Sequence, residues 1–492
     1  MGINTETETF RGYGKIKELT AQTAVECRFG QEVGTVLSVH ASAALTGADA
    51  GSGEVRYFGK AHFSIVYEDA EKRVCRAEKG VEFSARAVDE DCYPALAARA
   101  LIEVENVSVR REGASVYVTA LLGADIALYG EQSFDYLAGG ELVCKREPSK
   151  VFTAHLCGGA SEAEDEFETE SIGDILLHSE TPCVLSVNCE AGILRAEGEI
   201  NLGILALRGD TLVSFERLVP FNVEIPCDAA SYGLGATAKV SVLDVALHAD
   251  TDEEKGKCLI TARLTLGVDG CVFEETSVDG VMDAFSQECA VDLAYVEAES
   301  AGAGELVKLT ERVSGKAALS STIDFSDTLE AVTLQRAEAN LVFTAEGARL
   351  EGVAMATLLV RGADGSRRGV EMSLPFSVPV TAEGGTVSVL VCGMSARQRQ
   401  EGEIDAEATL KIAIQEKKTC SLKIVSSATA GAAHPACDSA ISVYIPRAGD
   451  GLWELAKSLK KSPEEVSANN PDIEFPVKEG QRVIIYRKKS LK

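Results

Sequence analysis

The sequence contains few aromatic and few basic side chains. Its 492 residues include one tryptophan and six histidines, and aromatic residues make up 6%. This composition argues against a catalytic cleft for sugars, because such pockets are lined by apolar and aromatic side chains. Lysine and arginine number 48 against 76 acidic residues, which gives a net charge of −28. A chain this acidic repels nucleic acid and anionic membranes, so neither is expected as a partner.

Long apolar runs and the common catalytic motifs are also missing. No stretch of about 18 apolar residues occurs, so no membrane span is expected. The chain has no G-x-S-x-G, no Walker A loop, no H-E-x-x-H and no paired Cys/His metal spacing. We therefore expect a protein that is not an enzyme, with no catalytic residues, no metal site and no cofactor. A hydrolase that uses two of the many carboxylates stays open as an alternative.

The sequence also lacks an export signal and closely spaced pairs of cysteines. Residues Met1–Phe10 are polar and acidic, and they lack the basic segment and apolar run of a secretory signal. The fourteen cysteines include no C-x-x-C pair, so no redox or zinc motif is indicated. We expect a cytoplasmic protein with reduced thiols, most of them buried in strands as small apolar residues.

What the sequence does contain is a repeat. Three segments begin with glycine, continue as an alternating apolar stretch, and lead after a turn to a phenylalanine 24, 23 and 24 residues after the glycine. Neighbouring copies begin 139 and 154 residues apart, which is too long for a solenoid and favours duplicated domains. The copies are Gly59–Tyr67 with Phe83, Gly198–Ala206 with Phe221, and Gly352–Val360 with Phe376.

Alternation with a period of two predicts strands that bury one face. The predicted fold class is mainly β: three repeated β-sandwich-like or barrel-like domains and a small C-terminal domain of strand, helix, helix and strand. The acidic run Glu162–Glu170 is interpreted as a solvated face or a linker, and the small, uncharged residues Val425–Ala436 as a flexible linker. The predicted β domains are 1–155, 171–290 and 291–424, followed by the linker 425–440 and the last domain 441–487.

The chain from Ile441 onward differs in charge and pattern from the rest. It carries ten basic and seven acidic residues, a net charge of +3, against −31 for the residues before it. Leu452–Leu459 presents one apolar helical face, and Asp450 is the expected cap of that helix. Ser462–Glu465 has the cap, proline and glutamate of a second helix start, which Asn469–Pro471 ends. A short strand on each side completes the predicted domain.

These elements resemble a LysM domain. The family's opening Gly-Asp-Thr-Leu-Trp appears as Gly449–Trp453, its Asn-Pro turn as Asn470-Pro471, and its closing Gly-Gln and strand as Gly480–Ile485. The resemblance implies a groove for N-acetylglucosamine-containing glycans between the loops before the first helix and after the second. Gly451 replaces the threonine and removes a hydroxyl, which weakens the expectation of sugar binding, and Trp453 is expected to pack in the core. The candidate ligand- or partner-binding residues are Gly449, Asp450, Gly451, Leu452, Asn470, Pro471, Asp472 and Ile473.

The acidic, repeated β body followed by one LysM module resembles proteins that join DUF3794 domains to a LysM domain, the spore coat morphogenetic proteins of the SipL and SpoVID type. The resemblance implies a non-enzymatic scaffold that recruits protein partners during spore envelope and coat assembly. It implies a location in the mother-cell cytoplasm at the forespore and spore coat surface. It also implies a protein ligand for the LysM module, the coat-basement ATPase of the forespore surface. The alternative is binding of N-acetylglucosamine-containing glycan in peptidoglycan or cortex.

Overall fold

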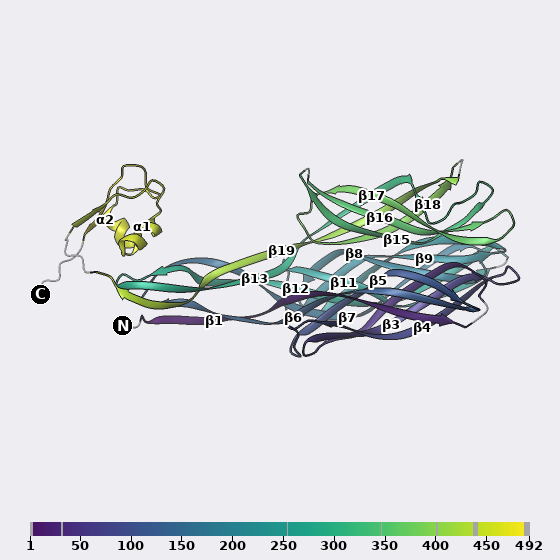
Figure 1. The fold of residues 1–492 in the computed structure, drawn as a ribbon, viewed down its shortest axis with the longest axis horizontal. Coiled ribbons are helices and arrows are strands. Elements are labelled where there is room, and N and C mark those ends of the chain that lie inside the picture. Colours follow the sequence, from purple (N-terminus) through teal and green to yellow (C-terminus); the bar gives the residue numbers. More distant parts are fainter. Residues whose placement is uncertain are drawn as a thin grey trace.

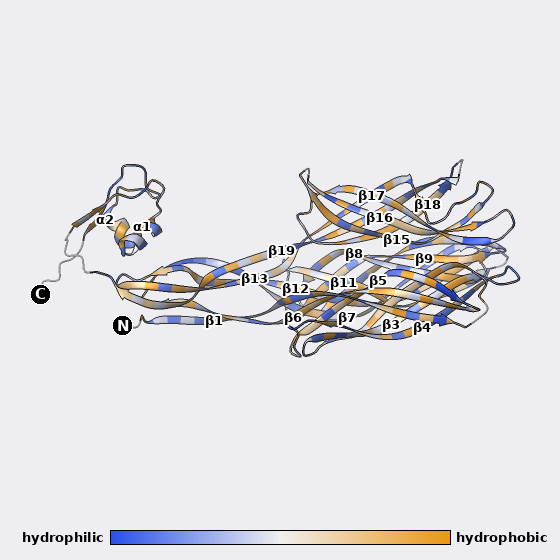
Figure 2. Ribbon diagram, viewed as in Figure 1, coloured by the Kyte–Doolittle hydropathy of each residue, from blue (hydrophilic) through white to orange (hydrophobic). Residues whose placement is uncertain are grey.

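The computed structural model describes residues 3–30, 33–252, 254–345, 347–399, 402–435 and 441–486. In these residues the chain is mainly β, as the alternation predicts, and the two helices lie near its C-terminal end. Hydrophobic and hydrophilic residues alternate along the strands (Figure 2). Figure 1 shows three groups of strands packed together, and a narrow stalk of long strands that runs from them toward the C-terminal helices.

The first group, unit 1, comprises residues 5–140. Its two sheets have the strand orders β1-β6-β5 and β2-β3-β4, and every pair is antiparallel. The sheets share one cluster of buried side chains that includes Phe63 and Leu122. The strands are β1 (Thr5–Phe29), β2 (Thr35–Ala50), β3 (Glu54–Glu68), β4 (Val74–Val88), β5 (Ala97–Glu112) and β6 (Ser115–Gly140).

Unit 2, residues 143–285, and unit 3, residues 289–433, repeat this plan. In each unit the first strand pairs with the last, a three-stranded meander forms the second sheet, and one hydrophobic cluster joins the two sheets. Unit 3 adds a short strand at the edge of its second sheet. The strands are β7 (Val143–Glu170), β8 (Ile175–Glu190), β9 (Ile193–Arg208), β10 (Thr211–Pro226), β11 (Gly235–Asp252), β12 (Lys257–Phe285), β13 (Cys289–Lys316), β14 (Ala318–Leu319), β15 (Thr328–Thr344), β16 (Gly347–Arg361), β17 (Arg367–Val380), β18 (Thr386–Gln398) and β19 (Ile404–Ala433).

The unit boundaries differ from those that the sequence predicts. β7 begins at Val143, inside the predicted first domain. It ends in the acidic run Glu162–Glu170, in which glutamates on the exposed face alternate with more buried residues. Residues 425–433, expected as a flexible linker, form the end of β19 and pair with β13. Small side chains suit this stretch because it continues an alternating strand in a narrow part of the molecule. Residues 436–440 of the predicted linker lie outside the described residues.

The repeated glycine and phenylalanine are cross-strand partners in all three units. Gly59 lies opposite Phe83, Gly198 opposite Phe221, and Gly352 opposite Phe376 in the respective meanders. A Cβ on each glycine would lie 2.5 to 3.0 Å from the Cζ of the paired ring. The phenylalanine therefore occupies the space that a side chain would take, an arrangement known to stabilise glycines in sheets.

We predict that Gly198→Ala lowers the free energy of unfolding by about 1–3 kcal/mol, the usual cost of overpacking. The added Cβ would lie 2.1 Å from the Cys183 carbonyl oxygen and 2.5 Å from the Phe221 ring. Urea denaturation measures the change. Gly159→Ala in the same unit is the matched control, since its Cβ would meet nothing within 4 Å. Equal losses in the two variants would contradict this account.

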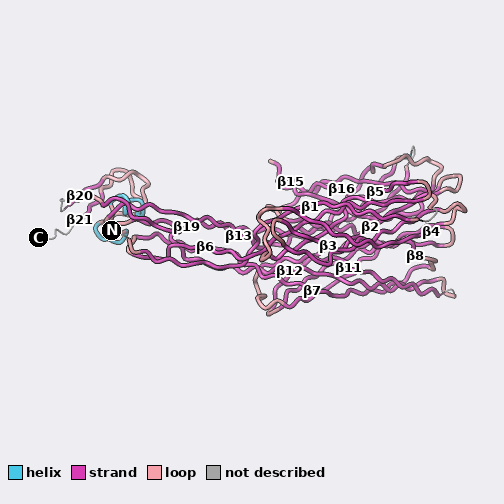
Figure 3. The backbone as a smooth tube through the Cα atoms, turned by 60° about the horizontal axis from the view of Figure 1, so that its bottom comes forward, coloured by secondary structure: helices cyan, strands magenta, loops and turns pink. Residues whose placement is uncertain are grey.

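The stalk consists of the free ends of the three long strand pairs. In unit 1, β5 leaves β6 at the pair Ala97–Tyr129, whereas β1 and β6 stay paired as far as Thr5 and Gly140. β7 with β12 and β13 with β19 extend in the same way, so that three two-stranded ribbons lie together (Figures 1 and 3). Side chains from all three ribbons, such as Phe134, Val278 and Ile424, form a shared apolar cluster. This packing holds the ribbons in one stalk.

The three units meet in a second shared cluster away from the stalk. Val66, Leu205 and Leu359 are spaced 139 and 154 residues apart, like the glycines of the repeat, and all three are at most 1% exposed. They belong to one cluster that draws residues from every unit. Equivalent residues thus face one another, which gives the units an approximately threefold arrangement.

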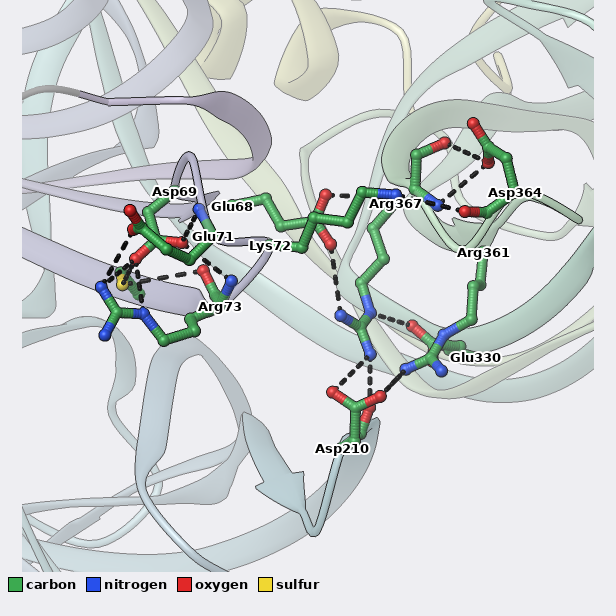
Figure 4. A network of polar contacts seen from close by, with 12 residues as sticks. Glu68, Asp69, Glu71, Lys72, Arg73, Asp210, Glu330, Arg361, Asp364 and Arg367 are labelled. Carbon is green, nitrogen blue, oxygen red and sulfur yellow. Dashed lines mark hydrogen bonds and ion pairs between the residues drawn. The ribbon is translucent and has the colours of Figure 1, made fainter.

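One buried arginine crosses this joint (Figure 4). Arg367 of unit 3 is 3% exposed in its side chain, and its guanidinium lies 2.8 Å from Glu330 of the same unit and 3.3 Å from Glu68 of unit 1. Its Nη2 donates to the backbone carbonyl of Asp210 in unit 2. Valine occupies the corresponding position of units 1 and 2, at the repeat spacing of 139 and 154 residues. The polar joint is therefore formed once.

We predict that Arg367→Met destabilises the protein by about 3–5 kcal/mol, because it leaves Glu68 buried without a countercharge and leaves Glu330 paired only with Arg361. Arg312→Met is the control. Arg312 also pairs with a glutamate, but its side chain is 74% exposed, and such surface pairs contribute about 0–1 kcal/mol. Denaturant titration of both variants measures the difference. A cost for Arg367→Met no greater than that of the control would show that the buried network adds no stability.

Candidate functional site

The C-terminal module, residues 441–486, stands at the free end of the stalk (Figure 3). Its elements are β20 (Ile441–Tyr444), α1 (Leu452–Leu459), α2 (Pro463–Asn469) and β21 (Val483–Tyr486), and β20 pairs antiparallel with β21. The helices pack on one face of this two-stranded sheet through a small core. The fully buried members of the core are Leu455, Ala456, Val466, Val477, Val483 and Ile485.

The helix starts agree with the sequence in one case and differ in the other. Ser462 caps α2 by accepting a hydrogen bond from the Glu465 backbone N–H, and proline follows it at the first helical position. The prediction that Asp450 caps α1 is wrong, because the cap residue is Gly451, which has no side chain to accept a bond. Asp450 lies one residue too early, and its carboxylate accepts from the Arg447 backbone N–H at 2.9 Å.

The two loops of the predicted groove lie side by side. Gly449 donates its backbone N–H to the Val477 carbonyl at 2.9 Å, and Val477 donates to the Asp450 carbonyl at 3.0 Å. Gly449, Pro471 and Asp472 are exposed. The remaining candidates are at least partly buried; they are Asp450, Gly451, Leu452, Asn470 and Ile473. These bonds join the first loop to Val477, which lies beyond the predicted residues of the second loop, and only some of the predicted residues reach solvent.

Asn470 is used by the fold itself. It is 6% exposed, and its side-chain amide donates to the carbonyls of Val466 and Ile484, both at 2.8 Å. Its Oδ1 accepts from the Ile484 backbone N–H at 2.7 Å. The side chain ties α2 to β21, which is a structural role that the sequence analysis did not foresee. A ligand in the groove would meet backbone groups there in place of this amide.

The outer face of the two-stranded sheet is an exposed apolar surface. Ile441 lies opposite Tyr486, and Val443 opposite Ile484, on the face that points away from the helices. Ile441 and Val443 are each 58% exposed, Tyr486 is 52% exposed, and Ile445, which follows β20, is 69% exposed. We call these five residues the outer face. The signal was present in the sequence, since β21 (Val-Ile-Ile-Tyr) is apolar on both sides while helices can cover only one.

The opposite side of the module, at α1, is docked on the stalk. The Trp453 indole N–H donates to the Asp283 carboxylate at 2.8 Å, and the Lys457 ammonium lies 2.7 Å from both oxygens of that carboxylate. The Trp453 ring meets Phe285 edge-on, with centroids 5.3 Å apart. Trp453 therefore packs against the module's core, as predicted, and it also joins this core to β12, which the prediction did not include.

Three histidines that are distant in sequence approach one carboxylate between units 1 and 2. His178 Nδ1 lies 3.1 Å from Glu180 Oε2. Burial acts to raise the pKa of Glu180, but the bond with His178 and the charges of His40 and His62 lower that pKa below its usual value. The Glu180 side chain is only 8% exposed, so the group forms a closed polar joint between units.

The described residues contain neither a metal-binding cluster nor a membrane-spanning helix. Within them, no three His, Cys, Asp or Glu side chains gather closely enough to hold a metal ion. The helices they contain are too short or too polar to cross a bilayer. The thirteen cysteines they include have free thiols, and eight of them are buried. Six of these eight lie in strands, so the expected burial in strands holds for fewer than half of the thirteen.

A comparison of the chain with protein-family models, curated proteins and solved structures finds no match. Function is therefore inferred from the geometry of the chain itself. Two surfaces of the C-terminal module are available to a ligand: the exposed outer face and the loops around Gly449 and Asp472. The third side of the module is occupied by the stalk.

We predict that Asp283→Ala loosens the joint between stalk and module. Trp453 is the only tryptophan, so its fluorescence reports on this joint directly, and its emission should shift to longer wavelength as the indole meets water. Asp279→Ala is the control, because Asp279 lies on the same strand but pairs with Arg146 of the stalk. An emission maximum that does not move in Asp283→Ala would contradict the docked arrangement.

Proposed function

We propose that the protein is a non-enzymatic scaffold that recruits protein partners in spore envelope and coat assembly, and that its C-terminal module is a LysM domain used for protein docking. The observation that carries this proposal is the outer face, an apolar surface presented on a module at the free end of a stalk. Soluble proteins seldom leave neighbouring apolar side chains exposed unless a partner covers them. The fold family proposed for the body is three DUF3794-like β-sandwich domains.

The chemistry of the outer face suits a protein partner. Two aliphatic strands and a tyrosine supply the apolar centre of an interface, for which aromatic residues are favoured. Fully burying one aliphatic or aromatic side chain contributes about 1.5–3 kcal/mol. The exposed basic residues Arg447, Lys478 and Arg482 and the net charge of +3 of the chain from Ile441 to Lys492 favour a partner whose contact surface is acidic.

Three features of the module favour a protein ligand over a sugar. Gly451 has no hydroxyl, and the Asn470 amide already donates hydrogen bonds to the carbonyls of Val466 and Ile484. The Trp453 indole contacts Asp283 and Phe285 of the stalk. The glycan alternative has one observation in its favour, because Gly449 before α1 and Asp472 after α2 are both exposed. The resemblance to coat morphogenetic proteins supports the coat-basement ATPase as the partner and the forespore surface, in the mother-cell cytoplasm, as the location.

The outer face is tested with the purified coat-basement ATPase and the full-length chain. We predict that Val443→Glu combined with Ile445→Glu weakens binding about tenfold or more, equivalent to ~1.4 kcal/mol, because two charges would be buried in an apolar contact. Val88→Glu is the matched control, since Val88 is 75% exposed on unit 1. Surface plasmon resonance measures the affinities. Equal affinity for both variants would exclude the outer face as the binding surface. Absence of binding by the unaltered chain would exclude the coat-basement ATPase as the partner.

Two further measurements separate the scaffold from the glycan-binding alternative. A fluorescent fusion of the full chain should form a ring around the forespore in a sporulating host, and a diffuse signal would contradict the scaffold. Calorimetric titration with chitin oligosaccharides to millimolar concentration should give no heat of binding. Saturable binding that Asp472→Trp abolishes, with the outer face unaltered, would favour the glycan alternative.

A further inference from the structure

A groove on the stalk lies outside the proposed docking module. It has a volume of about 460 Å³ and is lined by Glu131–Phe134 of β6, Val151 of β7 and Val296–Ser300 of β13. The groove thus runs between the ribbon of unit 1 and the ribbon of unit 3, over a residue of the ribbon of unit 2. No residue of β1 or β19, the pairing partners of β6 and β13, lines it.

The walls of this groove are open strand edges. The pairing of β6 with β5 ends at Tyr129, so at Glu131–Phe134 β6 pairs only with β1. β13 is the edge strand of the order β13-β19-β18. Successive side chains of a strand point to opposite faces, yet the groove is lined by unbroken runs of both strands. Such a lining means that the backbone edges themselves border the groove.

Open edges carry unpaired N–H and C=O groups, which makes them templates for another strand. An extended peptide can add to such an edge, with main-chain hydrogen bonds giving affinity and alternate side chains giving specificity. Five residues of β13 border the groove, a length of about 17 Å at the usual rise per residue. The groove therefore fits a segment of about five extended residues.

The side chains around the groove specify the chemistry of that segment. Its floor is apolar, because Val151 is buried and the Phe134 ring stacks on Phe10 with centroids 4.9 Å apart. Its rim is acidic. In the described part of the chain, Glu131 and Glu299 are exposed and have no ion-pair partner, and Glu297 pairs only with Lys423. Opposite charges across a strand pair are favourable.

We propose that this stalk groove binds an extended segment of a protein partner by strand addition between β6 and β13. The segment alternates lysine or arginine, facing the acidic rim, with small apolar residues that face Val151. This inference does not depend on the proposed function, because the groove belongs to units 1 to 3 and the outer face belongs to the C-terminal module. Both surfaces can be occupied at once.

The test uses the full-length chain and a fluorescein-labelled heptapeptide of alternating lysine and valine. Fluorescence anisotropy should show saturable binding, and Glu131→Lys combined with Glu299→Lys should weaken it at least tenfold. Asp292→Lys combined with Glu305→Lys is the matched control, since both residues are exposed on β13 outside the groove lining and the change in charge is identical. Absence of saturable binding, or equal weakening in both double variants, would overturn the proposal.

A second measurement distinguishes strand addition from simple charge attraction and needs no variant protein. The same peptide methylated on alternate backbone nitrogens keeps its charges but cannot donate those hydrogen bonds. It should bind the unaltered chain at least tenfold more weakly than the parent peptide. Equal binding of the two peptides would show that the groove attracts cations without pairing a strand, and would overturn the assignment.

Discussion

The architecture depends on the pairing of the first and last strands of each unit. In unit 1 this pairing runs from Thr5 opposite Gly140 to Phe29 opposite Val116, and the equivalent pairs of units 2 and 3 are as long. One half of each pair closes a unit around its core, and the other half forms a ribbon of the stalk. Because both halves belong to the same strands, the direction of the stalk is set by the packing of the units.

The three units are alike in plan but not in what joins them. The apolar cluster around Leu205 uses equivalent positions, as expected if the joint was built from copies. Arg367 breaks this equivalence by placing one charge where the other units have valine. Buried ion pairs contribute little net stability compared with apolar packing, but Arg367 bonds to residues of all three units and adds contacts that the equivalent valines cannot make. The likeness of the copies therefore need not lead to ambiguous packing.

Much of the fold could be predicted from local pattern, and the remainder depended on distant partners. Alternation indicated the strands, and the Gly198–Phe221 spacing indicated a repeat that proved to be a cross-strand pair. Residues 425–433 resemble a linker when taken alone, since only their pairing with β13 makes them a strand. Trp453 could not be assigned to the stalk joint because Asp283 lies 170 residues away. Asn470 was correctly placed in its loop, but the backbone of β21 determines what its amide does.

The covalent connection of three similar units has a thermodynamic consequence. A stalk and joint built from three separate copies would assemble with a strong dependence on concentration, as oligomers do. In one chain the same contacts form within a single molecule, so dilution cannot separate them. The copies can also diverge independently, so unit 3 has Arg367 where the other two units have valine. In a symmetric trimer any such change would occur three times, whereas in this chain it occurs in one unit only.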